Sequence, residues 1–354
     1  MFNNYKFDDK DPTGRHSFEI YDIDLAIVNS IRRSILSDIE IPGIIGEEEP
    51  TVQIIKSNGP LHNEILIHRI GLIPICLKES EIDNYIDNSI ELELNIENNT
   101  LNTINVTTEH ITGKRNDIDI TQKELNEIFY KNMVSNDNIL ITRLRPNEYL
   151  HFKAKVVKKN GKYNASFNPV SLASFSFIID KSKINKDTNI LDKERSYFTN
   201  KEGDPNAILF EIEPVNKYLK PKYLINKAIE SLINKLNKLI SDIKSENVLI
   251  EKYNDLESTY EFTIENEDDT LGNLIQSFIH DKFVRKKEKI QDNVECLYCG
   301  YICVHPLKNL LKIRLTLNQT IPNKFNDFLE YNCFSIIDNL QNIKNDWNIF
   351  MEKK

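Results

Sequence analysis

The sequence has no run of about 18 apolar residues, the length that a helix needs to cross a membrane. We therefore expect no membrane span. Glycine is also scarce, with 10 residues in 354, and the glycine-rich loops that bind phosphates or position a nucleophilic serine are missing. These absences argue against a catalytic site in this chain and against a small-molecule substrate.

Cysteine is scarce, and acidic residues outnumber basic ones. Five cysteines in a chain of this size do not form a disulfide scaffold, so a reducing intracellular compartment is expected. The first ten residues are mostly polar, and we expect no secretion signal there. The formal net charge is −9, whereas proteins that bind the phosphate backbone directly are more often basic. Any contact with DNA is therefore expected to be indirect.

The residues that are present predict two or three domains of the α+β class. A chain of 354 residues with 40% hydrophobic side chains can form real cores. Strict alternation over 91–96 and 103–107 is typical of half-buried strands. Apolar residues at spacings of three and four predict the main helices. These helices are expected over 25–39, 222–243, 270–281 and 324–350.

Two distant segments share one helix-entry pattern. Residues 24–33 and 269–278 each combine an acid, a leucine, a small residue and an asparagine with a helical run. The pattern aligns Asn29 with Asn273. A repeat of this kind suggests two related folding units, and related units usually pack together. The chain is therefore expected to form an intramolecular pseudo-dimer.

The cysteines near the C-terminus resemble zinc ligands in their spacing. Cys296, Cys299, Cys303 and His305 lie close together in the sequence. In a regular strand, however, Cys296 and Cys299 point to opposite faces, and Cys299 lies roughly 13 Å from Cys303. Buried thiols that act as small apolar residues are the simpler interpretation. A zinc-binding regulatory module remains the alternative, and metal analysis of the purified protein would decide between them.

Two other groups of polar residues suggest activity or binding. His62, Glu64 and His68 could serve a stand-alone enzyme, but the two histidines are six residues apart rather than the four of zinc proteases. Arg32 and Arg33 flank an apolar helical stripe, and arginine often binds carboxylates or carbonyls at protein interfaces. An intramolecular salt bridge is the alternative for this arginine pair.

Five motifs, in this order, resemble the α-subunit family of multisubunit DNA-dependent RNA polymerases. Three of them resemble the larger α-like subunit, and the last two resemble the smaller one, so the chain looks like a fusion of the two. Such fusions resemble those of large cytoplasmic DNA viruses. The motifs are Ala26–Ser37, Glu64–Ile75, Phe167–Val170, Asp269–Leu274 and Gly300–Leu307.

The resemblance implies a domain organisation. Residues 1–78 and 145–245 would form the larger dimerisation domain, and 248–354 the smaller one, with 245–247 as the linker. Residues 79–144 would be a β-rich insertion domain, which contains no cysteine and so cannot hold the zinc or iron–sulfur site of some relatives. No cofactor is expected.

The resemblance also implies a function. The chain would be a non-catalytic platform on which the largest and second-largest polymerase subunits assemble, together with small subunits. The polymerising Mg²⁺ would lie on other chains. The location would be the virion and host cytoplasm for a viral protein, and otherwise the nucleus. The expected subunit-interface residues are Asn29, Arg32, Arg33, His68, Arg69, Leu271, Asn273 and His305.

Overall fold

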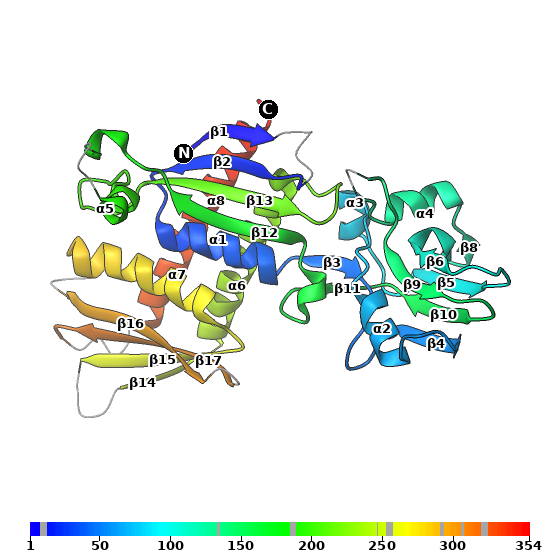
Figure 1. Cartoon of the computed structure of the whole chain (residues 1–354). Coiled ribbons are helices and arrows are strands. Elements are labelled where there is room, and N and C mark those ends of the chain that lie inside the picture. The colour runs from blue at the N-terminus through cyan, green and yellow to red at the C-terminus, as the bar shows by residue number, and fades with distance from the viewer. Residues whose placement is uncertain are drawn as a thin grey trace.

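The body of the protein consists of two antiparallel sheets with four helices between them, and a smaller lobe projects from one side (Figure 1). The fold is α+β, as the sequence predicts. The computed structural model describes residues 1–7, 13–132, 135–184, 189–245, 247–252, 258–290, 294–305, 308–319 and 325–354.

The first sheet brings together strands from both ends of the N-terminal half. Its four strands pair in the order β1 (Phe2–Phe7), β2 (His16–Tyr21), β13 (Ala207–Pro214) and β12 (Val170–Phe177). Every neighbouring pair is antiparallel. Burial alternates along β2, as expected for a sheet with one covered face. The helices of this unit are α1 (Leu25–Ser37), which follows β2, and α6 (Pro221–Lys244), which follows β13.

The second sheet has the same topology. Its strands pair in the order β14 (Leu249–Lys252), β15 (Thr259–Glu265), β17 (Lys308–Leu317) and β16 (Cys296–His305). Helix α7 (Asp269–Ile279) follows β15, and α8 (Phe325–Met351) follows β17. In chain order both units therefore run strand, strand, helix, strand, strand, helix. The repeated sequence pattern corresponds to α1 and α7, which occupy the same place in the two units.

Both repeated helices begin with an aspartate cap. The Asp24 carboxylate accepts a hydrogen bond from the backbone N–H of Ala26 at 2.6 Å, and Asp268 accepts one from Thr270 at 2.9 Å. These bonds satisfy N–H groups that have no partner within a helix. Helix α7 then continues into a π-helical turn, η4 (His280–Arg285). From the sequence alone, the charged run 282–291 predicts a loop, and this prediction is wrong for residues 282–285.

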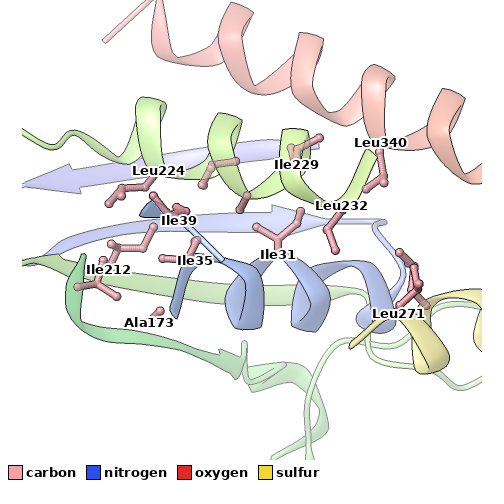
Figure 2. Packing of buried hydrophobic residues seen from close by; sticks show 14 of the residues in the cluster. Ile31, Ile35, Ile39, Ala173, Ile212, Leu224, Ile229, Leu232, Leu271 and Leu340 are labelled. Atoms are coloured by element: carbon pink, nitrogen blue, oxygen red, sulfur yellow. The ribbon is translucent and has the colours of Figure 1, made fainter. Parts of the chain in front are cut away.

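The two units share one hydrophobic core. Helix α8 of the second unit packs on α6 and on β1 of the first unit. Trp347 is fully buried, with its ring 4.7 Å from the ring of Phe18 and 5.1 Å from that of Phe2. Figure 2 shows the centre of this cluster, where Leu232 of α6 and Leu340 of α8 lie with side chains from α1 and α7. Each such aliphatic side chain contributes about 1.5–3 kcal/mol on burial.

A two-stranded ribbon joins the lobe to the body. Its strands are β3 (Glu40–Gly43) and β11 (Val157–Asn160), which pair antiparallel. Residues 44–156, between these two strands in the sequence, form the lobe. In the lobe, Arg69 of α2 (Asn63–Gly71) donates to the backbone carbonyls of Leu140 and Ile141 at 2.9 and 3.0 Å. These bonds hold α2 against β9 (Leu140–Leu144).

The lobe contains a five-stranded sheet and a separate strand pair. The sheet order is β4 (Val52–Ser57), β10 (Tyr149–Lys155), β5 (Ile90–Glu97), β7 (Thr112–Arg115) and β8 (Ile118–Asp119), and β6 (Ile104–Thr107) pairs with β9. Because β10 bonds to both β4 and β5, sheet hydrogen bonds cross the expected boundaries of the 79–144 insertion. The remaining short elements are α3 (Glu79–Asp83), η1 (Thr108–His110), α4 (Gln122–Ile128), η2 (Ala165–Phe167), η3 (Lys181–Lys183) and α5 (Ile190–Arg195).

The connection between the units is short. Ser245 caps the end of α6 and the N–H of Asn247 bonds to the carbonyl of Asp242, while Glu246 of the expected linker lies outside the described residues. Among the described helices, none combines the length and the apolar character that a bilayer crossing requires.

The packing of α8 on the first sheet can be tested at Phe18. Replacement by Ala removes the ring that lies between Trp347 and Phe210, and we expect the free energy of unfolding to fall by about 3–5 kcal/mol. Trp347 is the only tryptophan, so its fluorescence during urea unfolding reports on this contact directly. The control is Phe7→Ala, which removes a ring that is 40% exposed and should cost less than about 1 kcal/mol. Equal unfolding midpoints for the two variants would contradict the shared core.

Candidate subunit interface

One flank of α1 presents polar side chains away from the core. Asn29 and Arg32 are both half-buried on this flank. The Asn29 side-chain oxygen accepts hydrogen bonds from Nε and Nη2 of Arg32 at 3.1 and 3.0 Å. Burial and the neighbouring Arg33 charge lower the pKa of Arg32. Among the described residues, no carboxylate lies within ion-pair distance of Arg32, so its charge is oriented but not neutralised.

Asn29 and Asn273 line the same cleft. This cleft has a volume of about 700 Å³ and lies between the start of α1, the end of α7 and the loop 200–206. Arg285 of the second unit closes one side, because it pairs with Glu202, with Asp204 at 2.5 Å and with Asp281 at 2.7 Å. The Arg285 guanidinium lowers the pKa of Asp204. The two aligned asparagines thus border one cleft that both units form.

Arg33 and Leu271 face the joint between the units. Arg33 Nε donates to the Thr270 hydroxyl at 2.9 Å, and the Ser30 hydroxyl contacts the Thr270 carbonyl at 3.4 Å. Leu271 is fully buried in the shared core. The adjacent arginines therefore differ in direction, since Arg32 lies on the outer flank and Arg33 bonds to α7.

A partly buried charge cluster lies at the same joint. The Lys235 ammonium of α6 lies 2.9 Å from the Asp38 carboxylate and 3.9 Å from that of Glu267. Asp38 also accepts hydrogen bonds from the hydroxyls of Ser34 and Ser37 at 2.7 and 2.9 Å. Burial raises the pKa of Glu267, and the Lys235 charge offsets only part of that effect. Three segments from the two units thus meet at one lysine.

His68 and Arg69 belong to the lobe. His68 Nε2 lies 3.0 Å from a Glu47 carboxylate oxygen, and both side chains are about half exposed. Arg69 is instead engaged with β9, as described above. His62 and Glu64 line a shallow depression near Gly59, and His68 is not among its lining residues. The structure therefore does not bring His62, Glu64 and His68 into one site.

The cysteine strand differs from its prediction at one point. A register shift between Cys296 and Tyr298 inserts an extra residue, so Cys296 and Cys299 are both buried on the same face rather than on opposite faces. The Cys303 thiol contacts Asp269 at 3.3 Å, and burial, with this contact, raises its pKa to about 11. His305 is exposed at the end of β16. No three potential metal ligands gather anywhere in the described ranges.

Sequence reasoning missed several residues of the joint. Lys235 lies in the amphipathic helix α6, and a lysine in such a helix normally faces solvent, so the pattern gave no indication of its role. Arg285 belonged to a charged run that predicted a loop. Thr270 could have been singled out from the sequence, because it lies at the start of the second repeated helix, directly after the acidic residues that cap it. Which unit those side chains contact depends on how the units pack, and periodicity does not give that.

The fold and the joint define a class of protein, namely one built from two dimerisation units of the same topology in a single chain. Two family models described as "RNA polymerase Rpb3/Rpb11 dimerisation domain" match residues 17–236 and 259–346. The chain belongs to this family of RNA polymerase α-like subunits.

Similar full-length proteins share part of the chain. A conjugation stage-specific protein of Tetrahymena thermophila is 25% identical over 176 residues, covering 45% of this chain and 54% of that protein. Subunit RPAC1 of DNA-directed RNA polymerases I and III is 28% identical over 195 residues in Dictyostelium discoideum, covering 50% and 54%. The mouse RPAC1 is 27% identical over 180 residues, covering 46% and 50%. This chain thus spans about half the length of the curated relatives it matches.

The charge cluster predicts a pH effect at Glu267. Its pKa is raised above the ordinary value of 4.5, so the folded state favours the protonated form, and this contribution is lost as pH rises through the raised pKa. Glu267→Gln should therefore be more stable than the unmodified protein at neutral pH, with the difference shrinking toward pH 4.5. Thermal unfolding between pH 4 and 8 measures it, and a less stable Gln variant throughout would contradict the assignment.

Lys235→Met provides the opposite case. It leaves the Asp38 and Glu267 carboxylates without their shared cation. Removal of one partner from a buried pair costs about 3–5 kcal/mol, and this pair is slightly exposed, so about 3 kcal/mol is expected.

Proposed function

We propose that this protein is a non-catalytic assembly platform of a multisubunit DNA-directed RNA polymerase. Its two units form an intramolecular pseudo-dimer, and the pair recruits the largest and second-largest subunits together with small subunits. The observation that carries the proposal is the match of both halves to one dimerisation-domain family, combined with the apolar core that their helices share. The polymerising metal centre lies on the partner chains, and DNA is contacted only through the assembled complex.

The fusion explains what the shared core does. In a two-chain version of this platform, assembly depends on the concentration of both chains. When a short connection follows α6, the second unit is always close to the first, and docking becomes intramolecular. Obligate interfaces of this type are large and apolar, in keeping with the fully buried Trp347 and Leu340.

The outer flank of α1 is the proposed contact for the second-largest subunit. Asn29 holds the Arg32 guanidinium in place, and the described residues leave its charge without a carboxylate. A guanidinium that is already oriented loses less side-chain entropy when it binds a carboxylate or a carbonyl. Asn273 extends the same polar border along the cleft. His68 and His305 remain proposed contacts on exposed parts of the lobe and of β16.

The proposed location follows from the proposed complex. A polymerase platform works inside the cell, in the nucleus for a cellular enzyme. The one-chain fusion resembles that of large cytoplasmic DNA viruses, and for a viral chain the proposed locations are the host cytoplasm and the virion.

The two arginines give a direct test of the docking flank. Arg32→Ala should leave the unfolding midpoint nearly unchanged, because Arg32 bonds only within its own helix. The amount of second-largest subunit that co-purifies with the tagged chain from its native source should fall at least about tenfold, the loss typical of an interface hot spot. Mass spectrometry quantifies the recovered subunits.

Arg33→Ala is the matched control on the adjacent position. It removes the hydrogen bond to Thr270, so we expect a loss of about 1 kcal/mol in unfolding free energy with normal recovery of the large subunits. Unchanged recovery with Arg32→Ala would exclude this flank as the docking surface.

A further inference from the structure

Among the described strands, β16 lies at an edge of the second sheet and has β17 as its only neighbour. Although 28% of the chain is charged, the run from Cys296 to Val304 contains no charged residue. Its large apolar side chains are well exposed, with 56% for Leu297, 53% for Tyr298, 57% for Ile302 and 45% for Val304. Edge strands usually carry charges, prolines or bulges that prevent pairing with another chain. The register shifts of β16 lie at its two ends, between Cys296 and Tyr298 and between Cys303 and His305. The residues between these shifts include no charge, no proline and no bulge.

The backbone of β16 also offers unpaired hydrogen-bonding groups. The Cys299 carbonyl accepts from the Gln276 side chain at 3.3 Å, so it points away from β17. Because strand residues alternate in direction, the N–H and C=O groups of Tyr301 and Cys303 point to the same free side. Within the described ranges, no group bonds to them there. Free donors and acceptors at Tyr301 and Cys303 therefore lie beside a row of exposed apolar side chains, while the Cys299 carbonyl is already bonded to Gln276.

The other sheet edges in the body expose fewer large apolar side chains. Strand β14, on the opposite edge of the same sheet, is short and contains Glu251 and Lys252. Strand β1 has a register shift and a positive φ of 48° at Asn4. Strand β12 exposes the small polar residues Ser171 and Ser176. Strand β16 differs from these edges in exposing a row of large apolar side chains, although like β1 and β12 it has register shifts.

We propose that the β16 edge accepts an extended segment of a large polymerase subunit as a fifth antiparallel or parallel strand. The segment would carry apolar side chains at alternate positions, which pack on Tyr298, Ile302 and Val304. An acidic side chain would suit the neighbouring surface, where Lys312 and Arg314 pair with Glu261 at 2.6 and 2.8 Å. This mode of recognition combines backbone hydrogen bonds for affinity with side-chain contacts for specificity.

Two observations favour a large subunit over a second copy of this chain. First, one short strand pairing buries far less than the roughly 1,200 Å² that a stable interface needs, so the donor must be held by additional contacts. Second, β16 is continuous with the cleft that Asn29 and Asn273 border, because Gln276 of α7, one helical turn after Asn273, donates to the Cys299 carbonyl. The identity of the donor rests on the proposed function.

The test uses a charge placed on the edge. Ile302 and Leu249 lie on one cross-strand row of the sheet, at opposite edges, with Lys312 directly beside Ile302. Ile302→Glu can pair with Lys312 and so keep the sheet intact, while its charge opposes insertion of an apolar strand. Co-purification of both large subunits from the native source should fall at least about tenfold. Leu249→Glu, a matched control with similar exposure, should recover them normally.

Further measurements separate the outcomes. Trp347 fluorescence verifies folding, and Val304→Glu repeats the test if Ile302→Glu unfolds. In the assembled polymerase, the amides of Tyr301 and Cys303 should exchange hydrogen at least about tenfold more slowly than in the free chain, with no change along β14.

Normal recovery of the large subunits with Ile302→Glu, or unchanged hydrogen exchange, overturns the strand proposal alone. Recovery of no large subunit with the unmodified chain overturns the proposed function, and with it the donor. A dimer of the free chain that Ile302→Glu dissociates, detected by light scattering, would assign the edge to a second copy.

Discussion

The apolar seam between the two units is the interaction on which the rest of the structure depends. Helix α8 begins in the second unit and ends against the first sheet, where Trp347 packs on Phe18 and Phe2. Neither unit can cover its own sheet and helices completely without the other, because α6 and α8 share buried surface. The burial of aliphatic and aromatic side chains is non-directional. The seam therefore supplies stability but does not by itself fix how the units align.

Alignment comes from polar contacts at the border of the seam. Arg33 bonds to the Thr270 hydroxyl, and Lys235 lies between carboxylates from α1 and from the turn before α7. Arg285 joins the second unit to the loop 200–206. Such groups lose their partners if one unit slides or rotates, and an unpaired buried charge costs several kcal/mol. Their geometry thus selects one arrangement among many that would bury similar apolar area.

Sequence periodicity predicted the parts of the fold that depend on one element at a time. The apolar spacing of α6 and the acid that opens the repeated pattern at 24–33 are local patterns, and the structure contains both the amphipathic helix and an aspartate cap. Features that depend on two elements were missed or misplaced. The register shift at Leu297 places Cys296 and Cys299 on one face of the sheet. Strand β10 pairs with β4, so the lobe sheet includes a strand that precedes residue 79. Pairing register and tertiary contacts are non-local, so no single segment specifies them.

The repeat also shows how two similar units can present different surfaces. Successive residues of a helix point about 100° apart, so Arg32 lies on the outer flank of α1 while Arg33 bonds across the joint. In α7 the aligned position of Arg32 is Gln276, which bonds to the Cys299 carbonyl of its own sheet. The same helix position thus bears an oriented charge in one unit and stabilises a strand edge in the other.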